Sequence, residues 1–262
     1  MASSVVIAIP ARLSSTRLPR KMLLAETGHP LVEHTWRAAR QSQRAGRVVV
    51  VTDSDEIAAA VRGFGGEALM TSPEATSGTA RIVEALPRLG AVDVVVNVQG
   101  DEPELDPAAI DAAVELLGRC PEAGVATLVT RLRRAEDLHD QAAVKAVLTP
   151  WHSGTAAVPG AWRAVYFSRA AVPAAREWSP ALLAAEPPLY WQHVGLYAYR
   201  RAVLERWLEL PESRLAALES LEQLRAIEAG IPIAAAAIDH ATRGIDTPQD
   251  YAAFVARHLA RR

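Results

Sequence analysis

Cysteine is almost absent from this chain, which contains Cys120 and no other cysteine among its 262 residues. One thiol cannot form an intrachain disulfide, and it cannot build a zinc site from several thiolates. No feature of the sequence therefore indicates an oxidising compartment. We expect a cytoplasmic protein, and its hydrophobic content of 50% is enough for a sizeable buried core.

A strong net charge and a long apolar run are also missing. The formal net charge is −2, so no broad basic field is available to attract nucleic acid or an anionic membrane. The first apolar run, Val5–Ile9, stops at Pro10 and is too short for a signal-peptide core or a membrane span. We therefore expect neither a nucleic-acid partner nor a membrane anchor.

Neither of the two common glycine-rich phosphate patterns follows the first apolar run. The Walker pattern Gly-x-x-x-x-Gly-Lys and the dinucleotide pattern Gly-x-Gly-x-x-Gly are both absent there. A Walker-type phosphate loop is therefore excluded, and so is a Rossmann-type dehydrogenase.

What the first half does contain is strands that alternate with helices. Apolar runs rich in β-branched residues predict buried strands at Val5–Ile9, Val48–Val51 and Val92–Val98. Helical spacing and end signals predict helices at Leu31–Ser42, Asp55–Phe64 and Pro107–Leu117. This alternation predicts an α/β fold with a mostly parallel, Rossmann-like sheet flanked by helices.

The second half has a different pattern. Short strand candidates with little helix between them predict an antiparallel extension over about 125–200, with strands at Val125–Val129, Val144–Leu148, Ala164–Phe167 and His193–Tyr199. Residues 201–262 then return to the main sheet, with a helix at Leu215–Ala229, a strand at Ile231–Ala237 and a helix at Pro248–Leu259. Without a repeat or a linker, we expect a single domain over 1–262, with an α/β part at 1–124.

The loop Pro10–Lys21 follows the first strand, where open α/β sheets bind ligands. It carries four basic residues and three hydroxyls, and it contains no acid. Guanidinium forks and an ammonium group suit the oxygens of a polyphosphate. On composition alone, phosphate binding and a solvated basic surface loop both remain open.

Two acidic segments also follow predicted strands. Asn97–Pro103 contains Asp101, and Gly244–Pro248 contains Asp246. A carboxylate at the carboxyl end of a buried strand is a usual place for a Mg²⁺ ligand beside a phosphate. Each aspartate also has a structural interpretation, because Asp before a helix, as in Asp-x-Pro, is a common N-cap.

Taken together, these segments resemble the CMP-Kdo synthetases, the 3-deoxy-manno-octulosonate cytidylyltransferases. Residues 9–21 fit that family's Ile-Pro-Ala-Arg-x-x-Ser-Thr-Arg-Leu-Pro-x-Lys pattern, and residues 97–103 match Asn-Val-Gln-Gly-Asp-Glu-Pro. Further matches follow in the family's order at Ser77–Thr79 with Arg81, Val144–Lys145, Tyr166–Arg169, His193–Tyr197, Leu221–Arg225 and Gly244–Pro248. The resemblance thus spans nearly the whole chain.

The resemblance implies a nucleotidyltransferase that joins CMP from CTP to the anomeric hydroxyl of the acidic sugar Kdo and releases pyrophosphate, for lipopolysaccharide or a related glycan. It implies a homodimer and four catalytic residues, Arg12, Lys21, Asp101 and Asp246, of which the two aspartates bind Mg²⁺. The implied CTP-binding residues are Pro10, Ala11, Arg12, Lys21, Ser77, Gly78, Arg81 and Asp101. The implied sugar-binding residues are Arg17, Gln99, His193, Tyr197, Glu222 and Gln223.

Several positions depart from the family pattern. Arg20 stands where Gly is common, Met22 where Pro is common, and Ala80 and Ala216 where acidic residues are common, while 140–142 replaces a Pro-Asn pattern. These departures leave open a related sugar acid, such as 8-amino-Kdo or sialic acid, and a non-catalytic nucleotide-binding relative. His193 as a core histidine, Tyr197 as a packing residue, and Glu222 with Gln223 on a solvated helix face are the structural alternatives.

Overall fold

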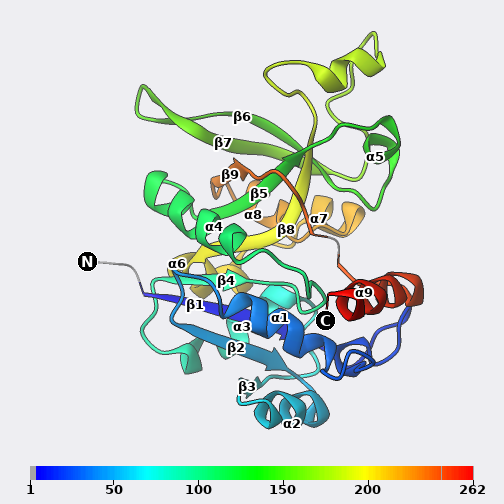
Figure 1. The fold of residues 1–262 in the computed structure, drawn as a ribbon. Coiled ribbons are helices and arrows are strands. Elements are labelled where there is room, and N and C mark those ends of the chain that lie inside the picture. Colours follow the sequence, from blue (N-terminus) through cyan, green and yellow to red (C-terminus); the bar gives the residue numbers. More distant parts are fainter. Residues whose placement is uncertain (1–3, 243, 262) are drawn as a thin grey trace. The chain divides into compact units, whose positions relative to one another are not determined.

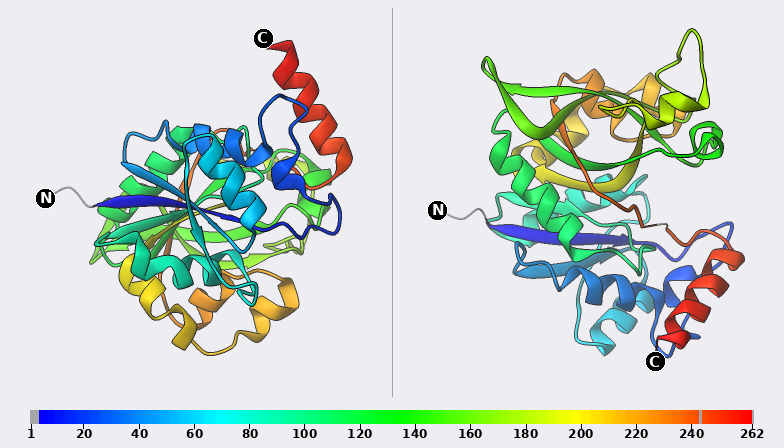
Figure 2. Two further views of the ribbon diagram at one scale, coloured as in Figure 1. Left: turned by 90° about the horizontal axis from the view of Figure 1, so that it is seen from below. Right: turned by 45° about the horizontal axis from the view of Figure 1, so that its top comes forward.

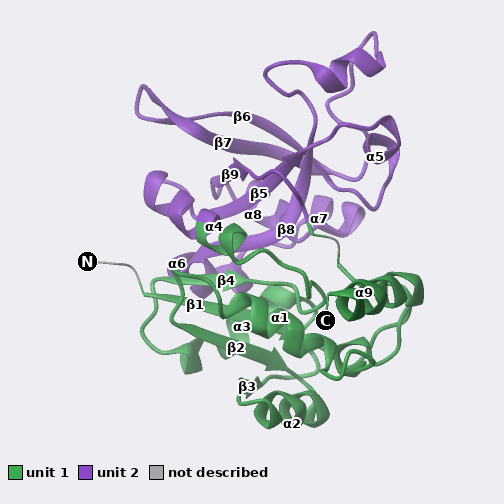
Figure 3. Ribbon diagram, in the orientation of Figure 1, with its two compact units in different colours: residues 1–111, 242–262 green, residues 112–241 purple. Residues whose placement is uncertain are grey.

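The chain divides into two units, residues 1–111 with 242–262 and residues 112–241 (Figures 1 and 3). The computed structural model describes residues 4–242 and 244–261. The outer bounds of the predicted domain, 1 and 262, lie outside the described residues. The single domain over 1–262, with its parts at 1–124, about 125–200 and 201–262, stays a prediction.

The sheet of the first unit is parallel. Its strands lie in the order β3-β2-β1-β4 and span β1 (Val5–Ala11), β2 (Arg47–Thr52), β3 (Glu67–Met70) and β4 (Val94–Asn97). β1 pairs with β2 and β4 on its two sides, and residues 6–9 are fully buried. This explains the continuous apolar run, since both faces of such a strand are covered. The predicted parallel sheet is confirmed.

Helices follow the strands of this unit. They are η1 (Lys21–Leu23), α1 (Leu31–Ala39), α2 (Asp55–Gly63), α3 (Gly78–Ala85), η2 (Leu86–Leu89), α4 (Pro107–Arg119), which continues into the second unit, and α9 (Pro248–Ala260). Figure 2 shows α9, in red, beside the blue segment that follows β1. Leu31 packs there in one apolar cluster with Tyr251 and Phe254. β3 and α3 were not predicted. The β3 segment, Glu67–Met70, contains no β-branched residue, and none of its residues is fully buried, so it lacks the apolar run that marked the other strands.

The second unit contains a mixed sheet. Its strands are β5 (Val125–Arg131), β6 (Lys145–Ser153), β7 (Ala156–Ser168), β8 (Trp191–Arg200) and β9 (Ile233–Ala237). β5 pairs antiparallel with β8 and parallel with β9, while β7 pairs antiparallel with β6 and β9. The expected antiparallel extension is confirmed.

The helices of this unit are short. They are α5 (Ala135–His139), η3 (Pro180–Ala184), α6 (Arg201–Glu205), η4 (Trp207–Glu209), α7 (Arg214–Glu219) and α8 (Leu224–Glu228). The prediction of one helix over Leu215–Ala229 is wrong, because Ser220 has a φ of 51° and ends α7. A left-handed residue cannot continue a right-handed helix. Among the described residues, we find no helix with the length and apolar character needed to cross a bilayer.

Candidate functional site

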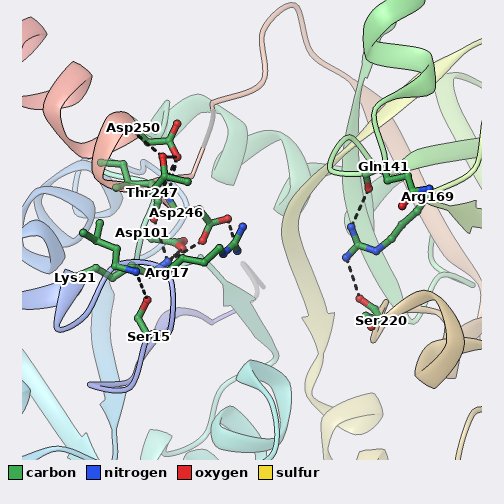
Figure 4. Close-up of polar contacts among 12 residues, drawn as sticks. Ser15, Arg17, Lys21, Asp101, Gln141, Arg169, Ser220, Asp246, Thr247 and Asp250 are labelled. Atoms are coloured by element: carbon green, nitrogen blue, oxygen red, sulfur yellow. Dashed lines mark hydrogen bonds and ion pairs between the residues drawn. The ribbon is translucent and has the colours of Figure 1, made fainter.

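Lys21 joins the two candidate metal carboxylates. Its ammonium donates to Asp101 Oδ2, to Asp246 Oδ1 at 3.1 Å and to the carbonyl oxygen of Ile245 at 3.0 Å (Figure 4). The Lys21 side chain is 12% exposed. Arg17 binds the second oxygen of Asp246, with Nη2 2.9 Å from Oδ2. The two aspartates, far apart in sequence, therefore converge on one point.

Backbone contacts bring the two aspartates together. The Ile245 N–H donates to the carbonyl oxygen of Asp101 at 2.8 Å. Ile245 is itself buried in the apolar cluster that contains Leu18 and Phe254. Gly100 is required on the other side, because a Cβ there would lie 2.9 Å from the carbonyl oxygen of Pro10. The positions of both carboxylates thus follow from buried packing.

Asp246 is not the cap of α9. The N-cap is Thr247, whose hydroxyl accepts from the N–H of Asp250 at 3.1 Å, while Asp250 Oδ2 accepts from the N–H of Thr247 at 2.9 Å. This reciprocal pair is a capping box. The structural interpretation of Asp246 as an N-cap is therefore wrong, and its carboxylate is left to bind Lys21 and Arg17.

The CTP candidates of the first unit differ in their surroundings. Pro10 and Ala11 are the last residues of β1, and the Arg12 that follows them has an exposed side chain without a hydrogen bond or ion pair to any other described residue. Ser77 caps α3, its hydroxyl accepting from the N–H of Ala80 at 3.1 Å. Among these CTP-binding candidates, Arg12 thus has a guanidinium group that is free to bind a phosphate.

Arg81 is engaged within the unit. Its guanidinium donates to Asp53 Oδ2 at 2.8 Å, to the hydroxyl of Thr71 at 2.6 Å and to the carbonyl oxygen of Ser72 at 3.3 Å. The Arg81 side chain is only 4% exposed. These contacts tie α3 to the segments that follow β2 and β3.

Asn97 is a residue to which the sequence reasoning assigned no role. It is the last residue of β4, it is 1% exposed, and its Oδ1 has no hydrogen-bond partner. Leaving such an acceptor unpaired costs about 1–3 kcal/mol, so it needs an explanation. Its amide lies beside Gly78, where a Cβ would be 3.9 Å from Asn97 Nδ2 and 3.4 Å from the ring of Pro10. The sequence signal that could have identified Asn97 is a polar amide at the end of a predicted buried strand.

Two sugar-binding candidates of the second unit lie on β8. His193 Nε2 is 3.0 Å from the hydroxyl of Thr127, which donates to the carbonyl oxygen of Leu196 at 2.8 Å. We therefore assign the proton of neutral His193 to Nε2. Burial lowers the pKa of His193 to about 3, and burial together with Tyr199 and Glu222 raises the pKa of Tyr197 well above its ordinary value. Both side chains are neutral at pH 7.

The other two, Glu222 and Gln223, lie in the turn between α7 and α8. Gln223 is 4% exposed, and its Nε2 is a buried donor without a partner in the described structure. A solvated helix face does not describe this residue. An unpaired buried amide N–H can donate to a ligand oxygen or to a water molecule. Gln99, the remaining sugar candidate, follows β4 in the first unit.

Arg169 holds that turn in place. Its guanidinium donates to three backbone carbonyls, those of Glu219 at 2.7 Å, Gln141 at 3.0 Å and Ser220 at 3.3 Å (Figure 4). The Glu219 carboxylate accepts from the hydroxyl of Ser168 at 2.6 Å and from the N–H of Arg169 at 2.9 Å. The left-handed Ser220 is therefore stabilised from outside its own helix.

Lys145 is a second cation bound only by carbonyls. Its fully buried ammonium donates to the carbonyl oxygens of Asp140 at 2.8 Å, Ala143 at 2.6 Å and Arg169 at 2.7 Å. All three ammonium protons are thus satisfied, which a buried charge requires. Lys145 fixes the loop before β6 to the segment after β7.

Known proteins place this fold and these motifs in a family. Residues 6–233 match the cytidylyltransferase family. A 3-deoxy-manno-octulosonate cytidylyltransferase of Rhodopirellula baltica is 47% identical over 253 residues, which cover 96% of this chain and 97% of that protein. The chain belongs to the cytidylyltransferase family. The resemblance read from the motifs is confirmed, and with it the nucleotidyltransferase class of enzyme.

Two further comparisons agree with this family. The 3-deoxy-manno-octulosonate cytidylyltransferase of Methylorubrum populi is 44% identical, over 95% of this chain and 94% of that protein. A solved structure of CMP:2-keto-3-deoxy-manno-octonic acid synthetase complexed with CTP matches with a TM-score of 0.87 and 36% identity, over 99% of this chain and 100% of that one. The predicted fold class is confirmed at this level.

Two of the residues that depart from the motif pattern described above, Arg20 and Met22, lie at the end of the first loop. Arg20 has a φ of 57°, a conformation that favours Gly, and its guanidinium pairs with both carboxylate oxygens of Glu56 in α2. Met22 is buried, and its sulfur would lie 3.3 Å from a Cβ on Gly100. Both departures are thus accommodated by local contacts.

Proposed function

We propose that this protein transfers CMP from CTP to the anomeric hydroxyl of 3-deoxy-D-manno-octulosonate (Kdo) and releases pyrophosphate. The observation that carries the proposal is the convergence of Asp101 and Asp246 on Lys21 at the end of the basic first loop. Relatives that share 43–47% of their residues with this chain bear the name of that activity. The presence of both aspartates speaks against a non-catalytic relative.

Asp101 and Asp246 fit a Mg²⁺ ion. This ion takes one or two protein carboxylates and fills its octahedron with water and phosphate oxygens. Two carboxylates that already share one cation, the Lys21 ammonium, meet that requirement. When bound, Mg²⁺ would lower the pKa of the attacking hydroxyl and neutralise charge on the phosphate.

The protein's own residues would position the substrates. Arg12 is an exposed, unpaired cation in the described structure, and it would hold phosphate oxygens of CTP. The unpaired Gln223 amide would donate to a sugar oxygen, and Tyr197 would remain protonated and able to donate. Such positioning and charge neutralisation supply most of the catalysis in phosphoryl-type transfer.

Three further properties belong to this proposal. CTP and the acidic sugar are the substrates, Mg²⁺ is the cofactor, and the protein acts in the cytoplasm as a homodimer. The product would enter lipopolysaccharide or a related glycan.

Pyrophosphate release tests the proposal. Purified protein is incubated with CTP and Mg²⁺ in separate reactions with Kdo, 8-amino-Kdo and sialic acid. We expect release with Kdo, and none in excess EDTA or when ATP replaces CTP. Comparable turnover in EDTA or with ATP would contradict the proposed activity, while release with another acid alone would change the acceptor.

A further inference from the structure

The Lys21 ammonium binds both of the carboxylates that would hold the proposed metal ion. It contacts Asp101 Oδ2 and Asp246 Oδ1, and it also binds the carbonyl oxygen of Ile245. All three of its protons therefore have acceptors, and its side chain is mostly shielded from water. Lys21 is thus an internal counter-ion to the aspartate pair.

We propose that Lys21 and a divalent cation compete for Asp101 and Asp246, so that metal binding transfers the Lys21 ammonium to the nucleotide phosphates. This inference rests on the proposed function and adds a second role for Lys21. Two cations held at contact distance by the same two carboxylate oxygens repel each other strongly where water is scarce. Binding of the metal ion therefore weakens the contacts of the Lys21 ammonium with both aspartates, and the ammonium weakens binding of the metal ion.

The structure favours Lys21 as the group that leaves. Lysine carries a compact charge on a flexible four-carbon stem, so its ammonium can swing while its backbone stays in place. The backbone at this point is fixed by the 3₁₀ turn η1, where the N–H of Leu24 donates to the carbonyl oxygen of Lys21. The loop around it carries Arg12 and Arg17, which makes it the part of this unit best suited to phosphate.

This exchange has a consequence for affinity. In the protein without nucleotide, a metal ion must displace an ion pair that is already formed, so its affinity is reduced. A polyphosphate that takes the Lys21 ammonium releases both carboxylates for the metal. Metal and nucleotide therefore bind cooperatively through Lys21, beyond any direct contact between them.

Mn²⁺ binding without nucleotide tests the competition. Free Mn²⁺ is followed by its electron paramagnetic resonance signal during titration of wild type, Lys21→Met and Lys21→Gln at one pH and ionic strength. Met has a length close to that of Lys without its charge. We expect its dissociation constant for Mn²⁺ to fall about tenfold or more, in the range of coupling between close charges. Circular dichroism confirms that each variant is folded.

Two matched variants separate competition from a general charge effect. Arg20→Met removes a cation from the same loop without touching either aspartate, and we expect its Mn²⁺ affinity to stay within about twofold of wild type because solvent screens its charge. Adding Asp101→Asn to Lys21→Met should abolish the gain. The competition is overturned if both Lys21 variants bind Mn²⁺ no more tightly than wild type, or if Arg20→Met gives an equal gain.

The titration contains neither CTP nor sugar, so it is independent of the pyrophosphate assay. An active, metal-dependent wild type whose Lys21 variants show no gain in Mn²⁺ affinity would refute the competition and leave the proposed function standing. A gain in Mn²⁺ affinity in a protein that releases no pyrophosphate would refute the proposed function and leave the competition standing.

Discussion

The N–H of Asp250 donates to the hydroxyl of Thr247 at 3.1 Å, and this contact assigns the cap of α9 to Thr247. The neighbouring Asp246 is thereby released from helix capping, and its carboxylate binds Lys21 and Arg17. The helix cap and the proposed metal ligand therefore fall on two adjacent residues, so the two roles can be tested separately by mutation.

We predict that Asp246→Asn is folded and at least about a hundredfold less active, equivalent to about 2.7 kcal/mol of lost transition-state stabilisation. Asn lacks the charge that would bind Mg²⁺. Thr247→Ala is the matched control, and it should lose about 1 kcal/mol of unfolding free energy with the cap while keeping activity within a few-fold. Pyrophosphate release at saturating CTP and Mg²⁺, with urea unfolding, measures both. Near-normal activity of Asp246→Asn would show that the metal assignment is wrong.

Arg12→Ala should weaken the use of CTP and leave stability unchanged. The side chain is exposed and has no hydrogen bond or ion pair with another described residue, so its removal should not break a polar contact within the folded protein. A charge-assisted contact to phosphate contributes about 1.5–3 kcal/mol, so kcat/KM for CTP should fall at least about tenfold. A kcat/KM within a factor of about two of wild type, equivalent to roughly 0.4 kcal/mol, would instead support the interpretation of Arg12 as a solvated surface residue.

Arg81→Met should show the opposite pattern. The substitution leaves the largely buried Asp53 carboxylate without its partner, and breaking such a pair costs about 3–5 kcal/mol. We expect urea unfolding to show a loss in this range, with KM for CTP close to wild type at a temperature where the variant is folded. Normal stability combined with a large increase in KM would instead support the direct role in CTP binding that the family motif implies.

His193 should make the protein less stable in acid. Burial lowers its pKa to about 3 in the folded state, against about 6.5 when unfolded. Below pH 6.5 the unfolded chain gains a proton that the folded chain does not take, so stability is complete above pH 6.5 and falls as the pH drops toward 3. Between pH 7.5 and 5 this one group accounts for about 2 kcal/mol.

Urea unfolding of wild type and His193→Asn at several pH values measures this contribution. The variant has no group that titrates at this position, so its stability should fall by about 2 kcal/mol less than that of wild type over the same interval. Asn is too short to place its amide where His193 Nε2 lies, so the variant also loses the hydrogen bond to the hydroxyl of Thr127. That loss lowers stability at every pH and does not alter the pH dependence that is compared. Parallel pH profiles for the two proteins would contradict the buried, neutral histidine.

Local sequence patterns predicted those parts of the fold that depend on local physics. The β-branched runs predicted β1, β2 and β4, and Asp101 was expected in the segment after the third strand and lies in the turn that follows β4. The cap of α9 was misassigned because Asp and Thr are both good caps. The spacing Thr247-x-x-Asp250, a capping-box pattern, could have decided between them.

The features that were missed depend on partners distant in sequence. The break at Ser220 is held by Arg169, which reaches it from the end of β7. Arg81 is fixed by Asp53 and Thr71 from two other segments. No pattern around either residue contains those partners, so neither role could be read from its own neighbourhood.

The two carbonyl-bound cations affect which substitutions the second unit can accept. Arg169 and Lys145 both bind main-chain oxygens of the loop before β6, at Gln141 for the first and at Asp140 and Ala143 for the second. Every amino acid supplies that oxygen, so side chains in the loop can drift during evolution while the contacts persist. Replacement of the side chains of Asp140, Gln141 and Ala143 therefore keeps these acceptors, whereas replacement of Lys145 or Arg169 removes their donors.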